Sequence, residues 1–232
     1  MLMFRQCFDP ESSTYSYLLA APTTHEAVLI DPVQGQTERD IRLVKELGVR
    51  LRWTLETHIH ADHVTGGSAL RAALGSKIAI SKASGANGAD RLLEHGDTIT
   101  FGGRALQMRA TPGHTPGCAA FVLDDESMVF TGDALMIRGC GRTDFQQGSP
   151  ATLFRSVREQ LFSLPDSCLV YPGHDYKGLS CSTIAEEKRH NPRLGLHMDV
   201  TGFSQIMDDL GLAYPKMIDV AVPANLRCGE QR

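Results

Sequence analysis

The sequence has no cluster of basic residues and no long apolar run, and each absence excludes a class of function. Its net charge is -4, and without clustered lysine and arginine it lacks the electrostatic footprint of proteins that bind nucleic acid or anionic membranes. No stretch is apolar enough to span a bilayer, and the start lacks the basic and then apolar order of a secretion signal. We therefore expect a cytoplasmic protein that acts on small molecules, with no nucleic-acid or membrane partner.

Cysteine pairs of the CxxC type are also absent, as are internal repeats and low-complexity tracts. At 232 residues with 42% hydrophobic content, the chain can bury a core without disulfide staples. We expect one domain over residues 1–232, in which the residues from about 180 form a short C-terminal extension packed on the rest. The thiols are expected to be reduced and mostly buried; they belong to Cys7, Cys118, Cys140, Cys168, Cys181 and Cys228.

Short strands and interspersed helices make up the predicted secondary structure. The hydrophobic patterns indicate strands at 15–20, 26–31, 51–57, 77–80, 98–101, 105–110, 119–123 and 128–131, and another within CLVYPG, residues 168–173. They indicate helices at 37–48, within 63–75, and at 150–164 and 181–190. Thr37 is the expected N-cap of the first helix and Gly48 its stop. This mixture predicts packed α and β layers rather than a simple βαβ array.

Side chains that favour metals follow four of the strands. Loops at one end of a sheet are where a rigid scaffold usually carries its site, so we expect these side chains to converge. The stretch LETHIHADHVTGG, residues 55–67, supplies four of them, and TPGHTPG, MVFTGD and CLVYPGH supply one each. They are His58, His60, Asp62, His63, His114, Asp133 and His174.

A structural interpretation competes with the metal site for each motif. A single histidine near a strand end is more often a hydrogen-bonded structural residue than a ligand. That interpretation weakens as the cluster grows. The proline and glycine of TPGHTPG and YPGH are ordinary turn residues, but the same turns would hold an imidazole rigidly.

The segments THIHADH, TPGHTPG, TGD and YPGH, in this order and at these intervals, resemble the metallo-β-lactamase superfamily. The resemblance runs from about Tyr15 to His174. It implies an α/β fold, the αβ/βα four-layer sandwich of two mixed β-sheets flanked by helices. A metal site would lie at the rim between the two sheets.

Four further segments, all in the second half of the chain, resemble a narrower family, the persulfide dioxygenases or ETHE1-like sulfur dioxygenases. They are GCGRTDFQQG (139–148), YPGHDYKG (171–178), EEKRHNPRL (186–194) and IDVAVPANLRCG (218–229). The related hydroxyacylglutathione hydrolases (glyoxalase II) have a similar GCGR-type segment but generally a longer helical C-terminal domain. The short tail therefore favours the dioxygenase.

This resemblance implies one Fe(II) per chain, held by His58, His114 and Asp133 as metal ligands and catalytic residues. Two imidazoles and one carboxylate leave open positions on Fe(II) for a substrate and O2. Hydrolases of the superfamily bind a second metal through residues that match Asp62, His63 and His174, and these are also present here. We interpret them, together with His60, as residues that do not bind the metal but hold its ligands in position. A dinuclear zinc site is the alternative.

The implied reaction is the oxidation of glutathione persulfide by O2 and water to sulfite and glutathione, a step of hydrogen sulfide oxidation and detoxification. By the same resemblance, Arg142, Tyr176 and Arg193 bind the glutathione moiety and Thr115 lines the site. The planar guanidinium suits a carboxylate, although solvated surface charge is the ordinary interpretation of an arginine. A homodimer and a functional link to a separate rhodanese-type sulfurtransferase are further expectations.

Two other functions compete with this one. The first is a hydroxyacylglutathione hydrolase, glyoxalase II-like, with a dinuclear zinc site. The second is a non-catalytic metal-binding or structural member of the superfamily. It has little support, because a protein without activity would not need both intact ligands and a pair of substrate-type arginines.

Overall fold

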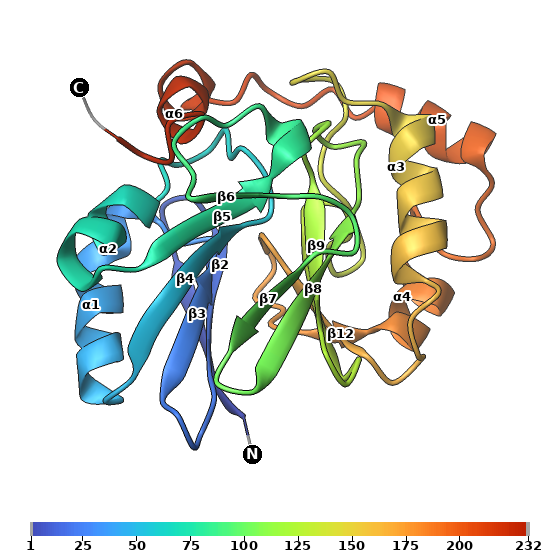
Figure 1. Ribbon diagram of the computed structural model, residues 1–232. Coiled ribbons are helices and arrows are strands. Elements are labelled where there is room, and N and C mark those ends of the chain that lie inside the picture. The colour runs from blue at the N-terminus through green and yellow to red at the C-terminus, as the bar shows by residue number, and fades with distance from the viewer. Residues whose placement is uncertain (1, 231–232) are drawn as a thin grey trace.

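Two six-stranded β-sheets face each other in the computed structural model, which describes residues 2–230 (Figure 1). The first sheet has the strands in sequence order. They are β1 (Met3–Asp9), β2 (Thr14–Ala20), β3 (Glu26–Ile30), β4 (Arg50–Glu56), β5 (Lys77–Ser81) and β6 (Arg91–Leu93). β1 to β3 pair antiparallel and β3 to β6 pair parallel, so the sheet is mixed.

The second sheet is also mixed and has the order β12-β11-β10-β9-β8-β7. Its strands are β7 (Thr98–Phe101), β8 (Arg104–Ala110), β9 (Ala119–Leu123), β10 (Met128–Gly132), β11 (Leu169–Pro172) and β12 (Ser182–Thr183). Only β10 and β11 pair parallel, which brings the C-terminal ends of two strands to one edge of the sheet.

The alternation of side chains along each strand divides the hydrophobic residues between two environments. In β2, Tyr17 and Leu19 point into the core between the sheets, where they join Phe121 and Phe130. Leu18 points the other way, into the cluster formed with the helices outside the first sheet. A strand that is buried on both faces must be apolar at nearly every position, which explains the continuous run YLLA.

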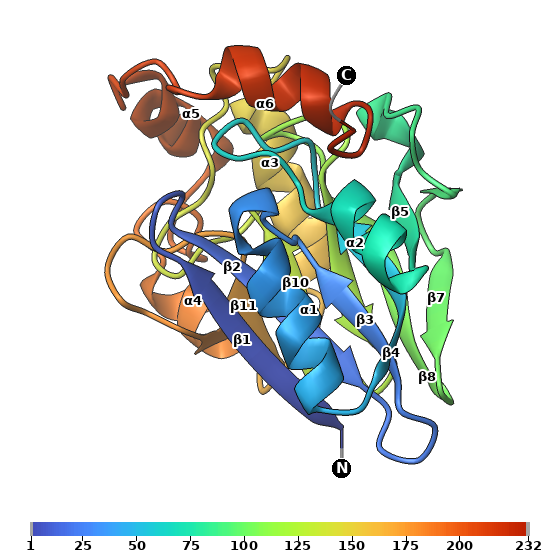
Figure 2. The ribbon, with the colours of Figure 1, turned by 90° about the vertical axis from the view of Figure 1, so that its left-hand side faces the viewer.

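Helices cover the outer face of each sheet (Figures 1 and 2). α1 (Thr37–Glu46) and α2 (Gly67–Leu74) lie outside the first sheet; α3 (Pro150–Ser156), its π-helical continuation η3 (Val157–Leu161) and α5 (Val200–Asp208) lie outside the second. Two short 3₁₀ turns, η1 (Gln34–Gln36) and η2 (Lys82–Ser84), complete the connections. These layers confirm the predicted four-layer α/β sandwich.

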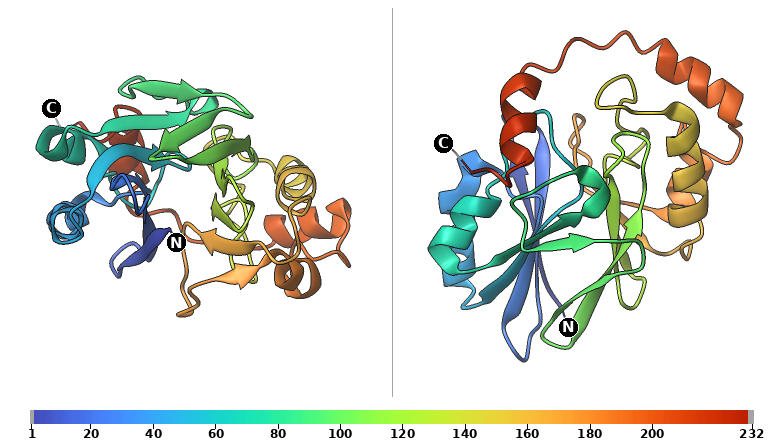
Figure 3. Two further views of the ribbon diagram at one scale, coloured as in Figure 1. Left: turned by 60° about the horizontal axis from the view of Figure 1, so that its bottom comes forward. Right: turned by 45° about the horizontal axis from the view of Figure 1, so that its top comes forward.

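The last part of the chain crosses from the second sheet to the first. α4 (Ile184–His190) and α5 lie on the side of the second sheet, and α6 (Ile218–Asn225) lies against the loop that follows β4 (Figure 3). The connecting segment, residues 209–217, has no regular structure. No helix within residues 2–230 combines the length and the apolar character needed to cross a membrane.

The structure differs from the sequence prediction at several element ends. α1 begins at Thr37 with Gln36 at the N-cap, so Thr37 is one position inside the helix and its hydroxyl donates back to the carbonyl of Gln34. Gly48 has a φ of 62°, the left-handed conformation that ends a helix. The sequence prediction missed β1, β6 and β12 and the helices α5 and α6.

Candidate metal centre

Three strand ends bring His58, His114 and Asp133 together. His58 follows β4 in the first sheet, whereas His114 follows β8 and Asp133 follows β10 in the second. Asp133 Oδ2 lies 3.9 Å from His58 Nε2 and 3.6 Å from His114 Nε2, and the two imidazole rings are 5.0 Å apart. These donors form one of the potential metal-binding clusters of the described chain.

Two glycines allow this close approach. At Gly132, with a φ of 51°, a β-carbon would lie 2.6 Å from Thr57 Oγ1. At Gly141 it would lie 2.8 Å from Asp133 Cβ and 2.9 Å from His114 Cγ. A larger residue at either position would therefore push the strand ends apart.

His58 has its free nitrogen fixed by a chain of hydrogen bonds. The Thr57 hydroxyl donates to Asp31 Oδ2 at 2.8 Å and therefore accepts from His58 Nδ1 at 2.9 Å. The proton of His58 then resides on Nδ1, and Nε2 offers its lone pair to the centre. Burial, reinforced by His60, keeps the pKa of His58 well below its usual value, so the ring is neutral, as a ligand must be.

His114 is oriented in the same way by a backbone group. Its Nδ1 donates to the carbonyl of Arg142 at 2.6 Å, which leaves Nε2 free on the side of Asp133. Two imidazoles and one carboxylate thus present their donor atoms at one point. This is the donor set of mononuclear non-haem iron sites, so the residues fit a divalent iron.

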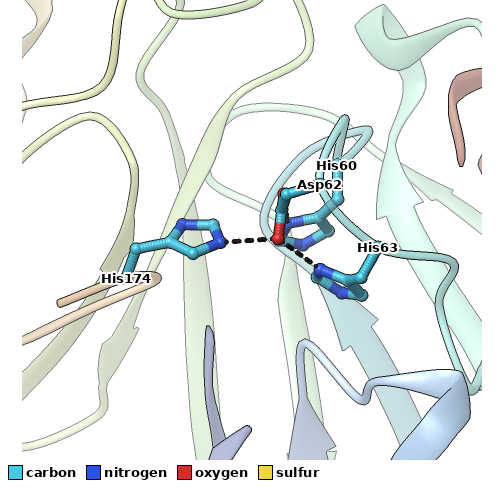
Figure 4. Close-up of side chains that lie close together, drawn as sticks. All are labelled: His60, Asp62, His63 and His174. Atoms are coloured by element: carbon cyan, nitrogen blue, oxygen red, sulfur yellow. Dashed lines mark hydrogen bonds and ion pairs between the residues drawn. The ribbon is translucent and has the colours of Figure 1, made fainter. Parts of the chain in front are cut away.

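A second group of donors lies beside the first and is occupied with its own hydrogen bonds (Figure 4). Asp62 Oδ2 accepts from His63 Nδ1 at 2.8 Å and from His174 Nε2 at 2.9 Å. His174 Nδ1 in turn donates to Asp133 Oδ1 at 2.7 Å. Asp133 therefore turns one oxygen to His174 and the other to His58 and His114.

The charges of this second group agree with that arrangement. Burial lowers the pKa of His174, but Asp133 and Asp62 outweigh burial and raise it well above its usual value. A protonated ring donates to both carboxylates at once. Burial raises the pKa of Asp133, but His174 outweighs burial and holds it below its usual value, so this carboxylate is ionised.

His60 lies against His58 and His63, with ring centres 4.0 and 4.4 Å apart, and its Nε2 faces a buried pair of carboxylates. Its Nε2 lies 3.3 Å from Asp31 Oδ1 and 3.9 Å from Glu56 Oε2. Burial lowers the pKa of His60, but the nearby carboxylate of Asp31 raises it to about 9. Burial and Asp31 together raise the pKa of Glu56 to about 8. The sequence interpretation missed Glu56, although an acidic residue at the end of an apolar strand is an available signal.

A cavity of about 990 Å³ opens onto the centre, with His114, Asp133 and His174 among its lining residues. Its walls carry opposite charges. Asp9, Glu11 and Asp175 supply carboxylates. The basic residues that line it are Arg138, Arg142, Lys177, Arg193 and Lys216.

The residues expected to bind the substrate are placed differently from one another. Tyr176 and both arginines line the cavity. Tyr176 is 70% exposed, and its ring is parallel to that of His174 at 6.3 Å. Arg193 donates to the carbonyl of Cys140 at 3.3 Å. Thr115 is not among the described residues that line the cavity; it is buried, and its hydroxyl lies 3.2 Å from Cys118 Sγ.

Most donors of Arg142 are already bound within the protein. Its guanidinium makes a two-pronged pair with Asp144, at 2.6 and 2.7 Å, and donates to the carbonyl of Ala213 at 2.7 Å. It also stacks on Phe145, with 4.4 Å to the ring centre. Arg142 therefore ties the 139–148 segment to residues 209–217.

The chain is similar to known proteins over almost its whole length. A family model described as the metallo-beta-lactamase superfamily matches residues 9–174. A protein of Bos taurus named "Persulfide dioxygenase ETHE1, mitochondrial" is 57% identical over 231 residues, which cover 99% of this chain and 90% of the relative. The Homo sapiens protein of the same name is 55% identical with the same coverage. The crystal structure of ETHE1 from Myxococcus xanthus matches with a TM-score of 0.95 and 49% identity, covering 98% of this chain and 100% of that one.

Proposed function

Because the chain belongs to the metallo-β-lactamase superfamily and, within it, to the family of the ETHE1 persulfide dioxygenases, we propose that it is a glutathione-dependent persulfide dioxygenase. Its reaction converts glutathione persulfide, O2 and water to sulfite and glutathione. The observation that carries the proposal is the near full-length similarity to enzymes of that name. The two-histidine, one-carboxylate donor set agrees with it.

We propose that His58, His114 and Asp133 hold one Fe(II). When bound, Fe(II) supplies the redox chemistry that a sulfur dioxygenation needs. The chain supplies the geometry: the Thr57 hydroxyl and the Arg142 carbonyl bind the Nδ1 atoms of His58 and His114 and so turn their Nε2 atoms to the centre. His174 holds one oxygen of Asp133 and thereby aims the other.

The charged walls of the cavity suit glutathione, which carries two carboxylates and one ammonium group. Of the two expected arginines, Arg193 has more donors free to bind a carboxylate, since Arg142 is bound to Asp144 and Ala213. Tyr176 lies at the cavity next to His174, where its ring can pack against the substrate chain.

The alternative is a dizinc hydroxyacylglutathione hydrolase, and one observation favours it: Asp62, His63 and His174 form a group with metal-binding spacing. We favour the mononuclear site because of the near full-length similarity to the persulfide dioxygenases. In that proposal Asp62 binds His174, and His174 orients Asp133. The cytoplasmic location, the homodimer and the rhodanese link stay predictions.

The deciding experiment compares two substrates on protein purified without oxygen after growth with iron. We expect about one iron per chain, O2 uptake and sulfite release with glutathione persulfide, and almost no hydrolysis of S-lactoylglutathione. His58→Ala should lose iron and O2 uptake together. Two zinc ions per chain with rapid thioester hydrolysis would assign the protein to the hydrolases instead.

A further inference from the structure

Two of the segments that resemble the dioxygenases, EEKRHNPRL and IDVAVPANLRCG, supply no side chain to the three potential metal-binding clusters. Each of them nevertheless places an asparagine in the interior. Asn191 is 0% exposed and Asn225 is 3% exposed, whereas Asn87, the remaining asparagine, is exposed. A buried amide needs partners for two donors and an acceptor, so what these two side chains bind indicates what they do.

Asn225 binds only the backbone of the loop that carries His58 to His63. Its Nδ2 donates to the carbonyl of His60 at 2.9 Å and to that of His63 at 2.8 Å. Its Oδ1 accepts from the backbone N–H of Thr65 at 2.9 Å. One side chain at the end of α6 thus fixes three backbone groups that lie about 160 residues earlier in the sequence.

The loop that Asn225 fixes reaches a metal ligand through two further side chains. Asp62 lies between the two carbonyls that Asn225 binds, and it accepts from His174 at 2.9 Å. His174 then donates to Asp133 Oδ1 at 2.7 Å. A displacement of the loop therefore turns the carboxylate of Asp133.

Asn191 fixes a second loop, at Gly139, on the other side of the centre. Its Nδ2 donates to the carbonyl of Gly139 at 3.0 Å and to Glu187 Oε2 at 2.9 Å. Its Oδ1 accepts from the backbone N–H groups of Arg193 and Leu194 at 3.0 and 2.9 Å.

The loop at Gly139 continues directly to groups that fix two ligands. The N–H of Gly141 donates to the backbone carbonyl of Asp133 at 2.7 Å. The carbonyl of Arg142 accepts from His114 Nδ1 at 2.6 Å. The position of this loop therefore sets the direction in which His114 Nε2 points.

We propose that Asn191 and Asn225 are positioning residues through which the C-terminal segment fixes the geometry of the metal centre. The inference rests on the proposed ligand set, His58, His114 and Asp133. An amide suits these places because each side chain donates two hydrogen bonds from one nitrogen and accepts at least one on its oxygen. Alanine removes all of these bonds, and aspartate at 225 keeps the acceptor for Thr65 but sets a carboxylate against two carbonyls.

The test measures metal binding rather than turnover, so its outcome is independent of whether the protein oxidises persulfides. Co(II) is the probe, because its visible absorption depends on the geometry of its ligands. Its dissociation constant is measured by competition with a chelator in the wild type, Asn225→Ala, Asn225→Asp and Asn191→Ala. Asn87→Ala is the matched control, and loss of the signal in His58→Ala identifies the site that is observed.

The three variants at 191 and 225 should bind Co(II) roughly ten- to a hundred-fold more weakly, the usual effect of losing a group that orients a ligand. Their Co(II) spectra should also change, whereas Asn87→Ala should match the wild type. Folded Asn191→Ala and Asn225→Ala variants with the wild-type affinity and spectrum would overturn the proposal. If the alanine variants do not fold, Asn225→Asp decides in the same way.

Discussion

Asp31 and Thr57 show how a single residue can serve the centre without touching it. The sequence allows two roles for Asp31, a turn former before Pro32 or a group that orients the metal loop. The structure gives it both, with a φ of 50° at the turn and a carboxylate that binds the N–H and the hydroxyl of Thr57. Thr57 then sets the tautomer of His58.

Replacing Thr57 by valine keeps the shape of the side chain but removes the acceptor for His58 Nδ1. The ring can then rotate or take the other tautomer, so the affinity for a divalent metal should fall roughly ten- to a hundred-fold. Chelator competition measures this. Thr54→Val is the control, because Thr54 is also buried in β4 but binds the carbonyl of Lys77. Equal affinities in the two variants would show that the hydroxyl does not matter.

At the scale of elements, strands and helices are predicted best from the sequence where the local hydrophobic pattern agrees with their burial. The strands β2 to β5 and β7 to β10 are apolar runs or alternations bounded by turns, and they lie where the patterns place them. β1 was missed because it is an edge strand of half-buried residues with polar side chains among them. α6 was missed because Pro223 lies inside it, and proline normally ends a helix.

Some parts of the site can be predicted from the sequence and others cannot. The ligand loops are visible in the sequence because histidine and aspartate at strand ends are rare types in a recognisable order. The partners of those loops are not visible in this way. Asn191 and Asn225 act on groups chosen by the tertiary fold, some of them about 160 residues away, and no local pattern encodes such pairs.

The connecting segment, residues 209–217, gives Arg142 and Arg193 different expected phenotypes. Arg193→Ala should mainly raise KM for glutathione persulfide and lower kcat/KM roughly ten- to a hundred-fold, because a lost charge-assisted hydrogen bond is worth about 1.5 to 3 kcal/mol. Arg142→Ala should have a similar effect on kcat/KM and should also free the segment, so that trypsin cuts after Lys216 faster.

Oxygen-uptake kinetics and limited proteolysis followed by mass spectrometry measure the two effects. Arg91→Ala is the control, since Arg91 pairs with Asp97 at the surface. If both arginine variants kept the wild-type kcat/KM, glutathione would have to bind elsewhere. Unchanged proteolysis of Arg142→Ala would show that its bonds to Asp144 and Ala213 do not hold the segment.

On the scale of the whole molecule, the centre joins the two sheets. His58 comes from the first sheet, and His114 and Asp133 come from the second. A metal bound by all three is therefore a link across the sandwich that exists only in the folded state. Its binding energy adds directly to the free energy of unfolding.

Removing the metal with a chelator should accordingly lower Tm. A metal present at a hundred times its Kd stabilises the folded state by about 2.7 kcal/mol. For a chain of this length each kcal/mol shifts Tm by roughly 2 to 4 °C, so the expected loss is about 5 to 10 °C. Circular dichroism melts with and without chelator measure it. If the chelator lowered the Tm of His58→Ala by the same amount, the stabilising metal would have to bind at another place.

The two ends of the described chain lie far apart in the sandwich (Figure 1). β1 starts at Met3, paired with Ala20, and only its last residue, Asp9, pairs with Thr14 beside the metal centre. Gly229, in contrast, packs so tightly on the loop after β4 that a β-carbon there would lie 2.3 Å from the carbonyl oxygen of Thr65. An affinity tag or a surface tether on the N-terminal side would therefore leave the cavity facing solution. The same attachment on the C-terminal side would pull on the loop that carries the histidines.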